Sequence, residues 1–81
     1  MVTIERTQTG LRIERSTLKV LKALAEYLDL SLGDLVEGIV LHAFEGKAPF
    51  NPAVLTKIEQ LKAVYELKLT AADAHKMTEE D

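Results

Sequence analysis

Hydrophobic and polar residues follow two different periods along this chain. Between Gln8 and Glu14 they alternate: one face holds Thr9, Leu11 and Ile13, and the other holds Gln8, Gly10, Arg12 and Glu14. A period of two over about seven residues is typical of a half-buried strand. The rest of the chain repeats its apolar residues every three or four positions, which predicts helices. The expected fold is therefore mostly α with one short N-terminal β-strand.

The first helix is expected to follow Ser16, a favourable N-cap residue, and to run for about 12 residues. Its apolar stripe comprises Leu18, Leu21, Leu24, Ala25 and Leu28. Asp29 is expected to end it in the left-handed conformation, where Gly is more usual and Asp is tolerated.

The second helix is expected to start at the cap Ser31 and to end at Gly46. Its apolar residues cover more than one stripe: Leu32, Leu35, Val36, Ile39, Val40, Leu41, Ala43 and Phe44. A helix that is apolar around most of its circumference is buried on more than one side. One side can pack on the first helix, and the other predicts a partner chain.

The C-terminal part, residues 47–81, is expected to form one long and one short helix. Asn51 and Pro52 predict an N-cap followed by proline at the first helical position. The apolar stripe that follows extends to about Glu66, and a capping-box pattern opens the short helix at Thr70. This helix is expected to fray toward the acidic end, residues 79–81.

A single strand in a helical chain lacks a hydrogen-bonding partner, because its backbone N–H and C=O groups must pair with another strand. We therefore predict that the strand pairs antiparallel with the same strand of a second copy across a two-fold axis. The polar face of such a ribbon would present Gln8 and Arg12.

Composition limits the class of protein. The 81 residues indicate one small domain, and the absence of cysteine excludes disulfides and thiolate metal sites and fits a cytoplasmic location. No apolar run approaches a membrane span, and no signal-peptide pattern precedes the first residues, so the chain is expected to be complete and mature. Neither histidine, His42 nor His75, has a metal-ligand or catalytic constellation around it, and no Gly-rich phosphate loop is present. We therefore expect neither an enzyme nor a cofactor.

Charge is distributed unevenly. Residues 1–24 hold five Arg or Lys against two Glu, whereas residues 25–81 hold five basic and eleven acidic residues. A basic end on a chain of formal net charge −3 is expected where the N-terminal part meets an anionic partner. Chance unevenness over a few residues is the alternative.

A strand, a Ser-capped helix, a tight turn and a second Ser-capped helix within about 45 residues resemble the ribbon-helix-helix family of dimeric DNA-binding proteins. The resemblance rests on Gly10–Ile13, Leu18–Ala25 and Ser31–Phe44. It implies a homodimer with an intermolecular antiparallel β-ribbon in the DNA major groove, formed by residues 1–46, with residues 47–81 as a helical extension.

The same resemblance implies roles for individual residues. Base contacts fall on Gln8, Gly10 and Arg12. Gln suits adenine and Arg suits guanine, whereas Gly10 has no side chain and would at most let the backbone approach the groove. The N-terminus of the second helix would bind phosphate through Ser31, Leu32 and Gly33. Further candidates for phosphate contact are Arg6, Arg15, Lys19 and Lys22, and the expected dimer interface comprises Thr9, Leu11, Ile13, Val36, Ile39, Val40 and Phe44.

Three functions remain open from the sequence. The first is a cytoplasmic, sequence-specific transcriptional regulator that binds double-stranded DNA as a homodimer. The second is a protein-interaction module that uses the helices of residues 52–81, as antitoxins use C-terminal segments. The third is a dimer that has lost DNA binding, because Glu14 and Asp34 lie close to the expected contact surfaces.

Overall fold

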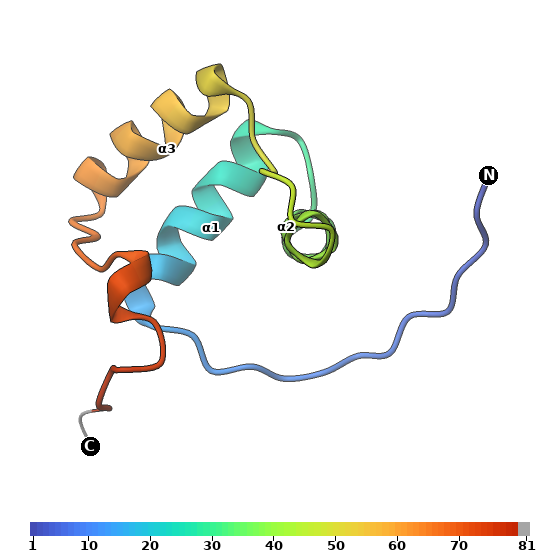
Figure 1. The fold of residues 1–81 in the computed structure, drawn as a ribbon, viewed down its shortest axis with the longest axis horizontal. Helices are drawn as coiled ribbons and strands as arrows, with labels where there is room; N and C mark the ends of the chain where they lie inside the picture. Colours follow the sequence, from blue (N-terminus) through green and yellow to red (C-terminus); the bar gives the residue numbers. More distant parts are fainter. Residues whose placement is uncertain (80–81) are drawn as a thin grey trace.

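A computed structural model describes residues 1–79 of the chain. Its three α-helices have 13 residues each: α1 spans Arg15–Tyr27, α2 spans Leu32–Phe44 and α3 spans Pro52–Val64. A single 3₁₀ turn, Ala71–Asp73, follows α3, and residues 1–13 form an extended arm that leads into α1 (Figure 1). The described chain therefore consists of helices and the turns and loops that connect them.

The predicted strand at Gln8–Glu14 is wrong. Residues 1–79 contain no strand, and so no β-ribbon, and within them no backbone hydrogen bond involves residues 1–13. The physical reason is that alternation specifies an extended path and an apolar face, whereas a strand also requires a second edge to complete its hydrogen-bond ladder. The helices leave the arm without such an edge.

The start of α1 also differs from the prediction, because Glu14 and not Ser16 is the N-cap. The Glu14 carboxylate accepts hydrogen bonds from the backbone N–H groups of Ser16 and Thr17, each at 2.9 Å. The hydroxyls of the same two residues also donate to it, at 2.7 Å and 2.8 Å. One acidic side chain thus satisfies two backbone donors at the positive end of the helix dipole.

The predicted starts of α2 and α3 are confirmed. The Ser31 hydroxyl accepts a hydrogen bond from the Asp34 N–H at 3.1 Å. The Asn51 side-chain oxygen accepts one from the Val54 N–H at 2.9 Å, and Pro52 is the first residue of α3. Both caps are local interactions between residues three apart, which is why the sequence pattern reveals them.

All three helices end in the same way, with one residue in the left-handed conformation. These residues are Asp29, Gly46 and Glu66, at φ of 57°, 69° and 56°. After α1, the N–H groups of Asp29 and Leu30 donate to the carbonyls of Glu26 and Ala25, and equivalent pairs follow α2 and α3. This is the Schellman pattern, and it confirms the predicted roles of Asp29 and Gly46.

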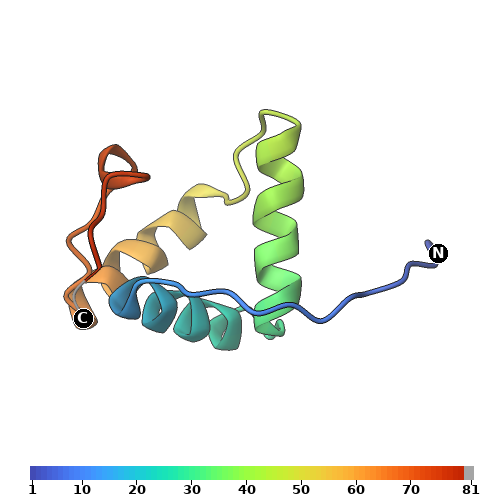
Figure 2. The ribbon, with the colours of Figure 1, turned by 90° about the horizontal axis from the view of Figure 1, so that it is seen from below.

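The core lies along α1, which is the central helix (Figures 1 and 2). Leu24 and Ala25 of α1 and Leu35 of α2 form the buried cluster, each 3–4% exposed. Other side chains pack against this cluster and are partly buried: Leu21, Leu28, Ile39, Phe50, Val54, Ile58 and Leu61. The amphipathic stripes expected for the first and third helices therefore meet within one chain.

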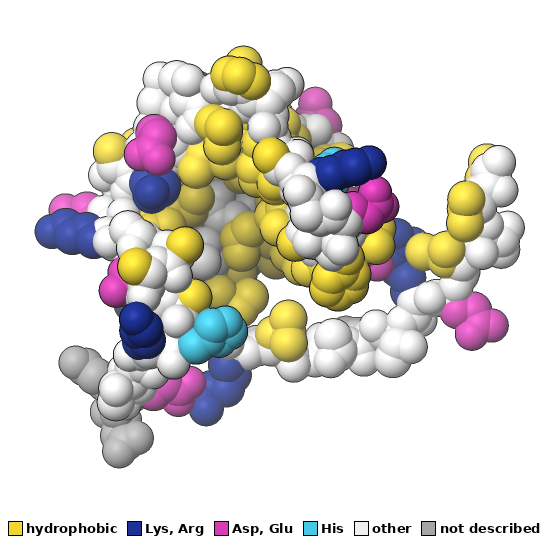
Figure 3. All heavy atoms as spheres, viewed as in Figure 1, with side chains coloured by type: hydrophobic (Ala, Val, Ile, Leu, Met, Phe, Trp, Pro, Cys, Tyr) yellow, Lys and Arg dark blue, Asp and Glu magenta, His cyan; other side chains and the backbone are white. Residues whose placement is uncertain are grey.

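The second helix leaves three large apolar side chains exposed, against two on α3 and one on α1. In the part of the chain that the structure describes, α2 packs on α1 and not on α3, and in Figure 2 it stands steeply across α1. Leu41 is 61% exposed and Phe44 is 80% exposed. Apolar side chains consequently gather on the surface around α2 (Figure 3).

After α3 the chain returns to the beginning of α1. Glu14 and Ser16 line one hollow with Lys76, Met77 and Thr78, which are at least 60 positions later in the sequence. Residues 67–79, here called the C-terminal strap, therefore cross the N-terminal end of α1 and come beside the arm (Figure 1). Within residues 1–79, no helix is long and apolar enough to span a membrane.

Candidate nucleic-acid interface

The arm is the most exposed part of the molecule that carries predicted contact residues. Every residue from 1 to 13 is exposed, including the apolar Leu11 and Ile13. The arm runs below α1 and past the N-terminal end of α2 (Figures 1 and 2). Its backbone and side chains are thus available to another molecule.

Arg6 fastens the arm to α2. Its guanidinium lies 2.9 Å from the Glu37 carboxylate and 3.3 Å from that of Asp34, and all three side chains are about half exposed. The hydrogen bond to Glu37, followed by the charge of Glu37, raises the pKa of Arg6 above its ordinary value. Exposed ion pairs of this kind contribute about 0–1 kcal/mol, so a stronger anion can replace either carboxylate.

A groove of about 640 Å³ lies between the arm, α1 and α2. It brings together predicted residues of all three kinds: Arg6, Gln8, Thr9, Leu11, Ile13, Lys22, Leu32, Gly33 and Val36. Glu5, Thr7, Leu18 and Glu37 complete its lining. Candidates for base, phosphate and dimer contacts are therefore neighbours in space, and both the arm and the helices contribute polar and apolar groups.

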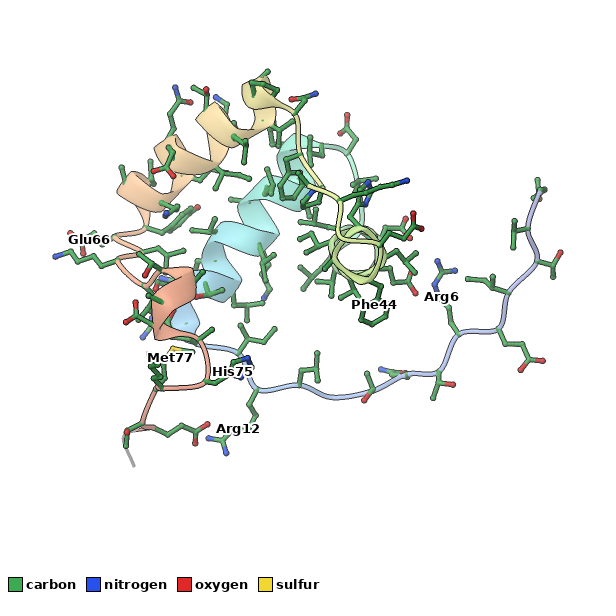
Figure 4. All side chains as sticks on the ribbon, viewed as in Figure 1. Arg6, Arg12, Phe44, Glu66, His75 and Met77 are labelled. Carbon is green, nitrogen blue, oxygen red and sulfur yellow. The ribbon has the colours of Figure 1, made fainter. Side chains whose placement is uncertain are left out.

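Arg12 lies outside this groove. Its guanidinium points to the C-terminal strap and lies 2.9 Å from the Glu79 carboxylate (Figure 4). Gly10 has open space around it, with no heavy atom within 4 Å of the position that a Cβ would occupy. The three predicted base contacts are thus distributed along the arm, with Arg12 held by an acidic partner.

The predicted phosphate site at the start of α2 contains an acid of its own. Ser31 caps the helix, and Leu32 and Gly33 begin its first turn, where free N–H groups attract anions. Asp34 stands in the same turn and is paired with Arg6. An incoming phosphate would therefore compete with the Asp34 carboxylate for this end of the helix.

The three basic candidates on α1 are exposed. Lys22 lines the 640 Å³ groove, and Arg15 lines a second hollow with the C-terminal strap. Lys19 is also exposed and takes part in none of the ion pairs among residues 1–79. Together with the arm, these residues form a basic edge along α1.

The expected dimer residues on α2 divide into two groups. Val36 and Ile39 are half-buried against the rest of the molecule, whereas Val40 and Phe44 are exposed. Leu41 joins the exposed group, although the sequence did not place it in the interface. Phe44 points away from α1 at the end of α2 (Figure 4).

Sequence reasoning also missed Glu37 and Glu79 as partners of the arm. They stand 31 and 67 positions from the arginines they bind, so no local spacing could have indicated either contact.

The two histidines give no competing site. His42 Nδ1 lies 2.7 Å from the Gly38 carbonyl oxygen, His75 is exposed in a turn, and residues 1–79 contain no cluster of potential metal ligands.

Comparisons with models of protein families, with curated proteins and with solved structures found no match to this chain.

Proposed function

We propose that the protein is a cytoplasmic DNA-binding regulator that acts as a homodimer, with the arm and the basic edge of α1 against double-stranded DNA. The proposal invokes no strand pairing. The arm itself is the contacting element, as an extended segment that can follow a groove.

The observation that supports this proposal most is the exposed arm. Thirteen consecutive residues are exposed and carry Arg6, Gln8 and Arg12, beside the exposed Arg15, Lys19 and Lys22 of α1. Guanidinium and amide side chains make bidentate contacts with base edges, and lysines neutralise phosphates. Such an arm meets an anionic polymer more readily than a protein surface of mixed charge.

The dimer in this proposal is supported by α2. Val40, Leu41 and Phe44 leave an apolar surface exposed toward the C-terminal end of α2, and only four of the described hydrophobic residues are buried. Small domains commonly complete their cores by association. A second copy on α2 would place two arms in one particle and double the number of phosphate contacts.

Two acids near the proposed surface are already engaged, which weakens their opposition to DNA. The Glu14 carboxylate is directed at the backbone N–H groups of α1, and Asp34 is paired with Arg6. Neither is a free charge facing the arm's outer side. The presence of Glu14 and Asp34 therefore does not require that the protein has lost DNA binding.

Selection of bound duplexes from random DNA, followed by salt titration of the best one, tests the proposal. If each subunit neutralises about four phosphates, the dimer neutralises about eight, and log Kd should change with log salt with a slope of magnitude near 7. A slope near zero would exclude this mode of binding.

Arg12→Ala identifies the contacting segment. We expect lower affinity, with discrimination at one base reduced by about 1–3 kcal/mol if Arg12 contacts a guanine, or a smaller salt slope if it contacts phosphate. Lys68→Ala is the matched control, because Lys68 is an exposed basic residue on the strap and outside both hollows beside the arm. Equal behaviour of the two variants would remove the arm from the interface.

A second candidate function is a protein-interaction module, and the exposed apolar surface of α2 favours it. An antitoxin-like version would use residues 52–81, where Leu55 and Val64 of α3 are exposed. The two functions can coexist in one dimer. Phe44→Asp separates them if it makes the protein monomeric. A monomer that still binds the duplex would show that DNA binding does not require dimerisation through α2, and the apolar surface of α2 would then be assigned to another protein.

A further inference from the structure

The C-terminal strap contacts the arm at the place where the arm joins α1. Met77, Thr78 and Glu79 line one side of a hollow of about 920 Å³, and Leu11, Arg12 and Ile13 line the other. The Arg12 guanidinium and the Glu79 carboxylate meet across it at 2.9 Å. His75 and Met77 lie beside this junction in Figure 4.

This contact has the chemistry of the DNA contact proposed for Arg12. A carboxylate is planar and a phosphate is tetrahedral, but each presents two oxygen atoms that a guanidinium can bind in a bidentate manner. Arg12 can therefore bind one or the other. Glu79 therefore brings a negative charge to one of the two arginines of the arm.

We propose that the C-terminal strap is an autoinhibitory cover for the arm, in which the Glu79 carboxylate competes with the DNA backbone for Arg12. The proposal rests on the DNA-binding function proposed above and adds a mode of regulation to it. Both side chains of the pair are mostly exposed, 83% and 69%, so the cover is weak and readily displaced. DNA binding at Arg12 would then require displacement of the Glu79 carboxylate.

The first test compares Glu79→Gln with Glu66→Gln in duplex binding. Both variants remove one negative charge, but Glu66 follows α3 and lies far from Arg12 in Figure 4. We expect Glu79→Gln to tighten binding about two- to fivefold at low salt and to have little effect at 0.5 M salt, where ion pairs are screened. Glu66→Gln should change the affinity less than twofold.

The second test observes the cover without relying on affinity. Because the chain has no cysteine, Thr78→Cys offers a single site for a nitroxide spin label. In the free protein the label should broaden the amide signals of residues 11–13, and Glu79→Gln should reduce this broadening. Addition of the selected duplex should remove it.

The outcomes distinguish failure of the cover from failure of the function. Duplex binding with unchanged affinity in Glu79→Gln, or arm signals that the label never broadens, overturns the cover and leaves the DNA-binding function intact. Absence of duplex binding in the wild-type protein, in Glu79→Gln and in a chain that ends at Met77 overturns both. Binding only by the last two would support a cover stronger than we expect.

Discussion

The two sides of α1 differ in how completely the chain covers them. On one side α3 packs its stripe of Val54, Ile58 and Leu61 against the buried Leu24 and Ala25. On the other side α2 contributes Leu35 to the core and leaves Leu41 and Phe44 exposed. The stripe of α3 that faces α1 is satisfied by contacts within one chain, although Leu55 and Val64 elsewhere on α3 stay exposed. The exposed apolar residues of α2 are suited to contacts with another molecule. Stability and assembly should therefore respond to different substitutions.

Leu24→Ala should have the largest effect, because Leu24 is 3% exposed at the centre of the small core. We expect a loss of about 2–5 kcal/mol of unfolding free energy, enough to unfold much of a small domain at 25 °C. Urea denaturation followed by circular dichroism measures it. Leu55→Ala, on the exposed face of α3, is the control and should cost under about 1 kcal/mol. Similar losses in both variants would contradict the assigned core.

Phe44→Asp should separate assembly from folding. A charge on the apolar surface of α2 should raise the dissociation constant of the proposed dimer at least about tenfold, which corresponds to about 1.4 kcal/mol, while the helices stay folded. Sedimentation velocity over a range of protein concentrations provides the measurement. Val64→Asp places the same charge on the exposed end of α3, where we expect no change in association. If Val64→Asp weakens the dimer and Phe44→Asp does not, the dimer forms through α3 and not through α2.

The three helix ends offer a smaller and more symmetrical test. Asp29 and Glu66 adopt positive φ without the freedom of glycine, so Asp29→Gly and Glu66→Gly should each stabilise the protein by about 0.5–1 kcal/mol. Gly46→Ala should destabilise it by about 1 kcal/mol, because alanine is strained at a φ of 69°. Thermal unfolding of the three variants checks both signs. Stabilisation by Gly46→Ala would show that α2 does not end as described.

Glu14 should produce the smallest effect, confined to the first turn of α1. Hydrogen bonds from the N–H and hydroxyl groups of Ser16, and then from those of Thr17, lower the pKa of Glu14 from its ordinary value of 4.5 to about 2. Because the folded pKa is below the unfolded one, the cap stabilises the protein above about pH 4.5, and this contribution is lost as the pH falls toward 2. The amide signals of Ser16 and Thr17 should titrate near pH 2. A midpoint near 4.5 in the folded protein would exclude the cap.

How much of this molecule could be predicted depended on the range of the interactions. Ser31, Asn51 and Gly46 form caps and turns with residues a few positions away, so their residue types were sufficient. Glu14 was missed because Ser16, two positions later, is the more usual cap residue, and only the folded geometry shows which side chain reaches the free N–H groups.

The strand and the candidate interface failed to follow from the pattern for a different reason. The alternation of residues 8–14 gave an extended arm, but strand formation depends on a partner edge that the described residues do not supply. Likewise, Arg6 and Arg12 were identified as exposed basic residues, whereas their partners Glu37 and Glu79 are distant in sequence. Contacts of that kind depend on how the helices are oriented, which composition and spacing do not determine.

The attachment of α2 to α1 alone has a consequence for how the molecule opens. Like α3, α2 packs on α1 and on no other helix, so it can detach while α1 and α3 remain paired, and its amide protons should exchange with solvent independently of those of α3. If a second copy covers α2, that exchange should slow as the protein is concentrated, while exchange in α3 stays the same. The rate of deuterium uptake by α2 would then measure the fraction of the protein that is self-associated.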